Sequence, residues 1–229
     1  MFINTVYKIK KLLSKLVLNS KLYLYLLNKK VFFKYIEPCH YLMKKKIVIF
    51  ISGKGTNALN IVSQFRDSDK ISVIKVFSNN INSPFLKIKK YSKIDTLYFS
   101  NDQLSSSVFE ELKIINPDLI VLAGFLKKIP NTYIDYFKNK IINIHPSILP
   151  NYGGKGMYGS KIHNKVIENN EIETGITIHY VSNQYDSGEI IFQKKISIQE
   201  NDTPTSIEEK IHILEYEYYP KVIQSILIK

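Results

Sequence analysis

Short apolar runs alternate with longer amphipathic stretches from residue 47 onward. The runs are rich in β-branched residues and read as strands that are buried on both faces. The stretches between them have the longer apolar period of helices. The predicted strands are 47–51, 72–77, 96–99, 119–123 and 141–144, and the predicted helices are 56–66, 84–91, 103–115 and 131–137.

The pattern changes after Pro150. A glycine-rich loop is followed by a predicted helix at 160–168, two strand-like runs at 175–181 and 189–197, and a long closing helix at 205–226. The spacing of the two late strands suggests antiparallel additions to the sheet. We therefore predict one α/β domain over 43–229, with a Rossmann-like, mostly parallel twisted sheet, helices on both faces and late antiparallel strands.

Residues 1–42 differ in composition from the rest of the chain. They hold eight lysines and one acidic residue, a net charge of +7, so the remainder carries +5 of the total +12. We interpret 1–42 as a basic N-terminal extension, either an appendage or an artefact upstream of a true start at Met43. A targeting segment is the alternative, but a stretch with no arginine and only two serines is a poor transit peptide.

The positive charge raises the question of nucleic-acid binding. However, the chain has a single arginine, Arg66, and therefore lacks the guanidinium forks that read bases or clamp phosphates. Its one cysteine, Cys39, excludes an internal disulfide and a cysteine-based metal cage. No run approaches the roughly 18 apolar residues that span a bilayer. We expect a cytoplasmic protein, a monomer or homodimer, that binds small molecules and neither nucleic acid nor membranes.

The segment ISGKGTN at 51–57 connects the first predicted strand to the first helix. Its glycines let the backbone approach a ligand, and the free N–H groups at the helix start can bind an anion. The spacing is not that of a Walker A loop, and no third glycine completes a GxGxxG pattern after Gly53 and Gly55. The segment predicts a phosphate site, although a tight turn with no ligand would look much the same.

A second segment, INIHPSILP at 142–150, follows a predicted strand and so lies at the carboxyl end of the sheet, where open α/β sheets keep their active sites. In an extended run Asn143 and His145 point to the same face. An amide beside an imidazole can supply an oxyanion donor and a proton donor. The alternative is a strand-end histidine that is hydrogen-bonded to the backbone.

A third segment, DSG at 186–188, lies between the two late strands. Asp186 followed by a glycine two residues later is a common turn signal. By itself the segment predicts no more than a hairpin turn.

These segments, together with LAGFLKKI at 122–129, TGITIHYV at 174–181 and the closing stretch LEYEYYP at 214–220, stand in the order seen in glycinamide ribonucleotide formyltransferases. The chain resembles this folate-dependent family from Met43 to its C-terminus. The resemblance implies transfer of a formyl group from 10-formyltetrahydrofolate to the amine of glycinamide ribonucleotide in de novo purine biosynthesis. It implies no metal.

The resemblance also implies roles for individual residues. Asn143 would donate to the formyl oxygen, His145 would be the proton donor, and Asp186 would stabilise the imidazolium and help to move the proton through water. Gly55, Thr56 and Asn57 would hold the substrate phosphate, and His212 and Glu215 would lie beside the glycinamide. The folate pterin would contact the main chain of Leu126, Lys127, Lys128 and Ile129, next to Asn143.

The chain departs from the family pattern at several places. Lys127 stands where many relatives carry an arginine, and an arginine that some relatives use near the folate tail has no counterpart before Gln103. The loop 153–159 is longer than in some relatives, which suggests either a folate-covering flap or a flexible connector.

Three alternatives remain within reach of the same motifs. A tRNA formyltransferase would carry an extra C-terminal nucleic-acid-binding domain, and a formyltetrahydrofolate hydrolase would carry a regulatory domain in front. A decayed paralogue would bind folate or phosphate without catalysis. The intact set of Asn143, His145 and Asp186 argues against decay.

Overall fold

The computed structural model describes residues 44–87 and 94–228. The chain divides into two units, Met1–Met43 and Lys44–Lys229, and all the described residues belong to the second. The predicted extension, residues 1–42, lies outside the described residues.

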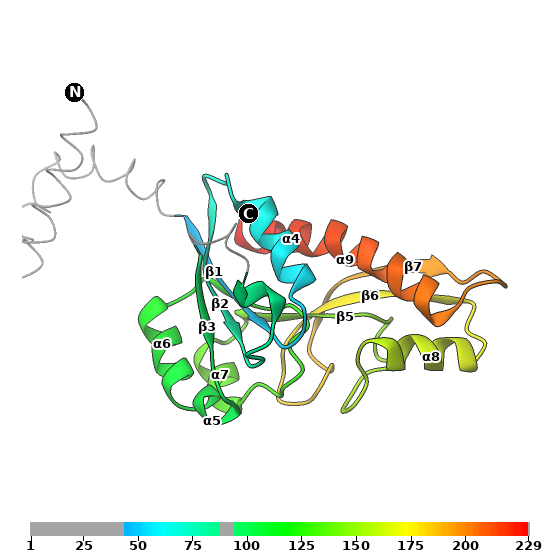
Figure 1. The fold of residues 1–229 in the computed structure, drawn as a ribbon, viewed down its shortest axis with the longest axis horizontal. Helices are drawn as coiled ribbons and strands as arrows, with labels where there is room; N and C mark the ends of the chain where they lie inside the picture. Colours follow the sequence, from blue (N-terminus) through cyan, green and yellow to red (C-terminus); the bar gives the residue numbers. More distant parts are fainter. Residues whose placement is uncertain (1–43, 88–93, 229) are drawn as a thin grey trace, which may run out of the picture. The chain divides into compact units, whose positions relative to one another are not determined.

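A seven-stranded sheet with the order β3-β2-β1-β4-β5-β6-β7 forms the centre of the second unit. Its strands are β1 (Lys45–Ile51), β2 (Ile71–Ser78), β3 (Asp95–Tyr98), β4 (Leu119–Leu122), β5 (Ile141–His145), β6 (Glu173–Tyr180) and β7 (Ile190–Ser197). The pairs among β1 to β5 are parallel, whereas β6 pairs antiparallel with both β5 and β7 (Figure 1). The predicted mostly parallel sheet with late antiparallel strands is confirmed.

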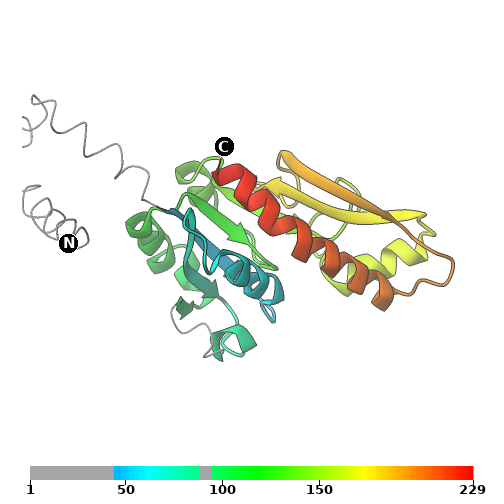
Figure 2. The ribbon, with the colours of Figure 1, turned by 90° about the horizontal axis from the view of Figure 1, so that it is seen from above.

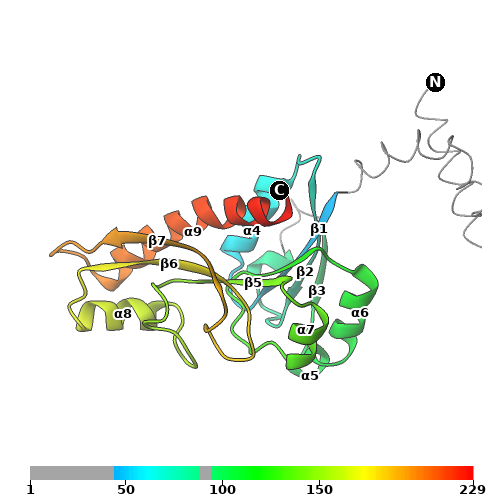
Figure 3. The ribbon, with the colours of Figure 1, turned by 180° about the vertical axis from the view of Figure 1, so that it is seen from behind.

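Helices cover both faces of the sheet. Helices α4 and α9 lie on one face, and α5, α6 and α7 lie on the other (Figures 1 and 3). Helix α8 packs against α9 beside the long β6–β7 ribbon (Figure 2). The helices are α4 (Thr56–Phe65), α5 (Asn101–Leu104), α6 (Ser107–Ile115), α7 (Asn131–Tyr136), α8 (Ser160–Glu168) and α9 (Pro204–Leu227), with a short 3-10 helix η1 (Pro84–Lys87). None of the helices in the described part of the chain is long and apolar enough to cross a membrane.

Alternation along β1 explains why two separate cores form. Ile47, Ile49 and Ile51 belong to the core beneath α4 and α9, whereas Val48 and Phe50 belong to the core beneath α5, α6 and α7. Successive side chains of a strand point to opposite faces, so a strand that is apolar at every position needs cover on both sides. The continuous apolar runs of the sequence therefore match the observed layers.

Two predicted helices differ from the structure. The single helix predicted at 103–115 is divided into α5 and α6 at a run of serines. The Ser106 hydroxyl donates to the carbonyl oxygen of Asp102 at 3.1 Å, and such local side-chain bonds compete with helical ones. The helix predicted at 84–91 is a 3-10 helix as far as Lys87, and residues 88–91 lie outside the described residues.

Helix α9 is fixed across the sheet by a buried tyrosine. The Tyr219 hydroxyl donates to the carbonyl oxygen of Leu122 at 2.9 Å. Because residues three apart share one face of a helix, His212 and Glu215 then project together from α9. Both line the same cavity.

Candidate active site

The end of β5 carries the first two polar side chains of the site. Ile142 and Ile144 are buried beneath α4 and α9, so Asn143 and His145 point to the opposite face. Strand β6 pairs Asn143 with His179. Residues directly opposite each other on paired strands share a face, so the pairing brings a second imidazole to the site.

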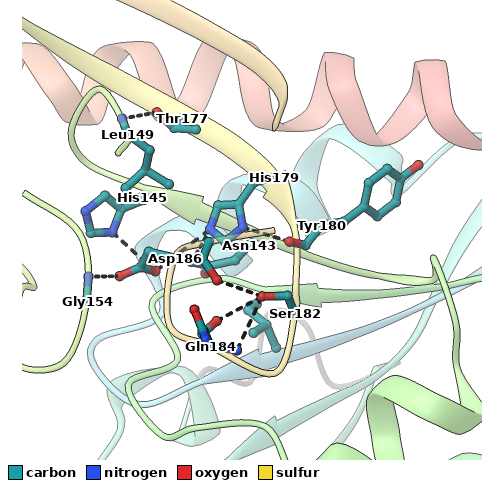
Figure 4. A network of polar contacts seen from close by, with 12 residues as sticks. Asn143, His145, Leu149, Gly154, Thr177, His179, Tyr180, Ser182, Gln184 and Asp186 are labelled. Atoms are coloured by element: carbon teal, nitrogen blue, oxygen red, sulfur yellow. Dashed lines mark hydrogen bonds and ion pairs between the residues drawn. The ribbon is translucent and has the colours of Figure 1, made fainter. Parts of the chain in front are cut away.

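His179 holds the amide of Asn143 in a defined orientation (Figure 4). The Nδ1 atom of His179 lies 2.9 Å from the carbonyl oxygen of Tyr180. Because a carbonyl oxygen can only accept, Nδ1 carries the proton and Nε2 accepts from the Asn143 amide nitrogen at 3.2 Å. Burial lowers the pKa of His179, which favours this neutral form. The second N–H of the Asn143 amide then remains for a ligand.

Asp186 lies between the two imidazoles. Its Oδ1 atom is 3.7 Å from Nδ1 of His145 and 3.8 Å from Nε2 of His179 (Figure 4). Its Oδ2 atom accepts from the backbone N–H of Gly154 at 2.9 Å. Both distances exceed that of a direct hydrogen bond. The turn predicted from the sequence is present, and its carboxylate faces the imidazoles.

The turn that carries Asp186 folds back tightly against β6. Asp186 has a positive φ of 53°, a conformation that Asp adopts more readily than most residues. A Cβ atom at Gly188 would lie 1.7 Å from the carbonyl oxygen of Tyr180, so only glycine fits there. The glycine of the DSG segment is thus needed for the approach that places Asp186 beside His145.

His145 is buried, and its Nε2 atom is hydrogen-bonded to the backbone. Its Nε2 atom lies 2.8 Å from the carbonyl oxygen of Tyr152. The sequence left open whether this residue is a backbone-bonded histidine or a proton donor. The structure shows the backbone bond at Nε2 and, on the other side of the ring, the Asp186 carboxylate near Nδ1.

A second polar group forms where α4 begins. Gly55 precedes the helix with φ of 78°, and a Cβ atom there would lie 2.9 Å from Cβ of Phe85. The Asn57 amide nitrogen donates to Oε2 of Glu215 at 2.8 Å. Burial raises the pKa of the Glu215 carboxyl, and the bond from Asn57 opposes that rise. The side-chain oxygen Oδ1 of Asn57 is buried and has no hydrogen-bond partner among the described residues.

Both groups line one cavity of about 550 Å³. The cavity collects all the residues that the sequence singled out for catalysis and for the amine substrate: Gly55, Thr56, Asn57, Asn143, His145, Asp186, His212 and Glu215. The loop 154–159 forms another part of its wall.

The predicted cofactor segment is shared between this cavity and a smaller one. Leu126 and Lys127 line the large cavity, whereas Lys127, Lys128 and Ile129 line an adjoining space of about 60 Å³ together with Asn143. The backbone N–H of Leu126 is already bonded to the Ser52 hydroxyl at 2.9 Å. Asn143 therefore stands where the two spaces meet.

Sequence reasoning missed His179. The signal was present, because Ile176 and Ile178 alternate with Thr177 and His179 in a predicted strand. The isoleucines are buried in the α4 and α9 core, which turns His179 to the face of Asn143. The missing information was the pairing of that strand with β5, which no local pattern specifies.

The arrangement can stabilise negative charge on an oxygen atom and move a proton. An oriented amide donor, an imidazole and a carboxylate meet at one wall of the cavity. Within the described residues, no group of three or more His, Cys, Asp or Glu side chains is arranged to hold a metal ion.

Comparison with known proteins gives a consistent result. Residues 45–223 match the family described as formyl transferase. A phosphoribosylglycinamide formyltransferase of Bacillus subtilis is 33% identical over 190 residues, which are 80% of this chain and 95% of that protein. A chloroplastic one of Arabidopsis thaliana is 34% identical over 191 residues, which are 80% of this chain but only 65% of that protein.

Solved structures agree with the sequence relatives. The crystal structure of phosphoribosylglycinamide formyltransferase from Bacillus halodurans is similar with a TM-score of 0.72 and 30% identity, covering 81% of this chain and 96% of that one. The resemblance predicted from the motifs is confirmed: the chain belongs to the formyl transferase family, among relatives that are phosphoribosylglycinamide formyltransferases.

Proposed function

We propose that this chain transfers the formyl group of 10-formyltetrahydrofolate to the amine of glycinamide ribonucleotide, a step of purine biosynthesis. Membership of the formyl transferase family implies a formyl donor of the folate type. The observation that carries the finer proposal is the single cavity that joins Asn143, His145 and Asp186 to the start of α4 and to Glu215.

In the proposed reaction the free amine nitrogen attacks the formyl carbon, and the carbonyl oxygen becomes an oxyanion. The free N–H of Asn143 donates to that oxygen, and protonated His145 beside it stabilises the same charge. When the tetrahedral intermediate collapses, the bond from carbon to the folate nitrogen breaks. The leaving nitrogen gains a proton and the attacking nitrogen loses one, so the protons balance.

Asp186 serves the proton transfer. A carboxylate oxygen 3.7 Å from Nδ1 of His145 attracts positive charge that develops on the ring while it moves a proton. The gap is too long for a direct hydrogen bond, and a bridging water would suit it. Asp186 would then pass the proton of the amine to solvent.

The remaining residues bind the two substrates. The N–H groups of Gly55, Thr56 and Asn57 at the start of α4 suit a phosphate, and His212 and Glu215 suit the glycinamide part of the same molecule. The segment from Leu126 to Ile129 would hold the pterin ring. In this arrangement the formyl carbon lies beside Asn143, where the two spaces meet.

Location and assembly stay predictions. We expect a cytoplasmic monomer or homodimer that uses no metal, although the Arabidopsis relative is named as a chloroplastic protein.

The test uses the purified full chain with 10-formyltetrahydrofolate in three arms. Glycinamide ribonucleotide, water alone and an initiator methionyl-tRNA serve as acceptors, and mass spectrometry identifies any formylated product. We expect formylation only of glycinamide ribonucleotide. Release of formate with water alone would favour a hydrolase, formylation of the tRNA would favour a tRNA formyltransferase, and no turnover in any arm would favour a non-catalytic binder.

A further inference from the structure

Tyr152 has an unusual backbone conformation in the loop between β5 and α8. Its φ is 57°, in the left-handed region that a bulky side chain rarely adopts. Such a conformation persists only where the surrounding contacts hold it. Tyr152 is held by contacts at two places, its side-chain hydroxyl and its main-chain carbonyl oxygen.

The side chain of Tyr152 is held at its hydroxyl. The hydroxyl donates to Oε1 of Glu171 at 2.7 Å and accepts from the amide nitrogen of Asn169 at 2.8 Å. Asn169 is the C-cap of α8, and the Glu171 N–H donates to the carbonyl oxygen of Val166 within that helix. The hydroxyl is thus anchored to the end of a helix.

The main chain of Tyr152 is held at the other end by His145. The carbonyl oxygen of Tyr152 lies 2.8 Å from Nε2 of His145. Since a carbonyl oxygen only accepts, this contact requires a proton on Nε2. It also leaves Nδ1 as the nitrogen that faces Asp186, at 3.7 Å.

We propose that Tyr152 is a positioning residue for His145. Its hydroxyl, held by Glu171 and Asn169, keeps the left-handed backbone in place, so that the Tyr152 carbonyl oxygen fixes the orientation and tautomer of the imidazole. Proton exchange in the reaction is then confined to Nδ1, next to Asp186. The effect on rate rests on the proposed formyl transfer, whereas the effect on the tautomer does not.

The test compares variants of the full chain by two readouts. Tyr152→Phe removes the hydroxyl and keeps the ring, Glu171→Ala removes the carboxylate, and Glu171→Gln keeps an acceptor oxygen. Tyr136→Phe is the matched control, since it removes a hydroxyl from an exposed ring on α7. The readouts are kcat and KM, and the nitrogen-15 NMR signature of the His145 tautomer.

In Tyr152→Phe and Glu171→Ala we expect kcat to fall by about ten- to a hundredfold, because a displacement of about 1 Å in a reacting group can cost about a hundredfold in rate. KM should stay unchanged, and His145 should change from the single tautomer with the proton on Nε2 to a mixture. Glu171→Gln should recover most of the rate and the single tautomer. Tyr136→Phe should match the unmodified chain in both readouts.

The proposal is overturned if Tyr152→Phe or Glu171→Ala leaves the tautomer unchanged, even where the melting temperature or the rate falls, because that result would indicate a purely structural contact. If Tyr152→Phe does not fold, Glu171→Ala decides by the same two readouts. If the tautomer changes as expected but neither the unmodified chain nor any variant transfers a formyl group, the positioning role stands and the proposed function fails.

Discussion

Asp186 and Glu215 line the same cavity, and the surroundings of their carboxylates differ in kind. Asp186 lies on a turn between two strands, accepts from a backbone N–H and faces two imidazoles. Glu215 lies within a long helix, is 6% exposed, and receives its hydrogen bond from the amide of Asn57. Asp186 is therefore placed to exchange a proton with the imidazoles beside it, whereas the side chain of Glu215 is held in place by the amide of Asn57.

The comparison suggests a division of labour across the cavity. The group around Asp186 comes from strand ends and tight turns, where side chains meet a reacting atom. The group around Glu215 comes from two helices, which suits the binding of a part of the substrate that does not react. Changes in the first group should therefore lower kcat, and changes in the second should raise KM.

The same substitution at two asparagines gives the largest contrast. Asn143→Ala removes the predicted oxyanion donor, and kcat should fall by on the order of a hundredfold or more. His145→Ala should do the same. Asn57→Ala should instead raise KM for the amine substrate and leave kcat close to normal. Steady-state kinetics with circular dichroism as a folding check would measure this, and near-normal kcat in Asn143→Ala would contradict the assignment.

Exchanging each carboxylate for its amide sharpens the comparison. Asp186→Asn keeps the turn, since Asn also adopts positive φ, but removes the charge beside His145. We expect kcat to fall by about tenfold or more, which corresponds to a rise of about 1.4 kcal/mol in the activation free energy. Glu215→Gln should change KM for the amine substrate more than kcat. Equal effects of both variants on kcat would contradict the proposed difference between the group around Asp186 and the group around Glu215.

A substitution at Gly55, the residue before α4, tests whether the close approach to Phe85 requires a glycine. Gly55→Ala introduces a Cβ atom 2.9 Å from Phe85 at positive φ, and we expect the free energy of unfolding to fall by about 1–3 kcal/mol. Gly124→Ala is the control, because Gly124 also has positive φ but no atom within 4 Å of the added Cβ. Thermal or urea unfolding should show the larger loss for Gly55→Ala, and an equal loss would exclude the steric contribution.

Two buried histidines, His163 and His179, should make the free energy of unfolding depend on pH. Burial lowers the pKa of His179 and of His163, so the unfolded chain takes up protons before the folded chain as the pH falls. The stability from these groups is complete above about pH 6.5 and is lost below it. His179→Gln keeps an acceptor for Asn143 without a titration in this range. Its melting temperature should therefore fall less than that of the unmodified chain on acidification, whereas an unchanged slope would contradict this role.

Removing residues 1–42 should have the smallest effect. The composition changes at Met43, and the family match begins at residue 45. A chain that starts at Met43 should keep kcat, KM and melting temperature nearly unchanged. A large loss in any of the three would make the extension part of the domain.

The sequence predicted the parts of this structure that depend on local periodicity. The strands and most helices follow from the spacing of apolar residues, and the shared face of Asn143 and His145 follows from the period of a strand. The break between α5 and α6 was missed because it depends on competition from serine hydroxyls, such as that of Ser106.

The parts that were missed depend on contacts between distant segments. His179 reaches Asn143 only because β6 pairs with β5, and the position of Asp186 beside His145 was accessible only through resemblance to a family. The partner of His145 Nε2 is a backbone carbonyl, which no side-chain pattern reveals. Local sequence patterns thus predicted the layers of helices and strands, whereas the contacts among the polar side chains of the site depend on tertiary structure.

The absent side chain at Gly188 has a consequence for protein engineering. The turn that presents Asp186 cannot be grafted onto another sheet as three residues, because its geometry depends on a backbone that passes within contact of the Tyr180 carbonyl oxygen. A functional graft has to carry the end of β6, the whole return from Val181 to Glu189 and the main-chain bond between Tyr180 and Glu189. The transferable unit is therefore a strand with its return loop. An aspartate that is moved alone would keep its carboxylate but lose the orientation that this loop gives it.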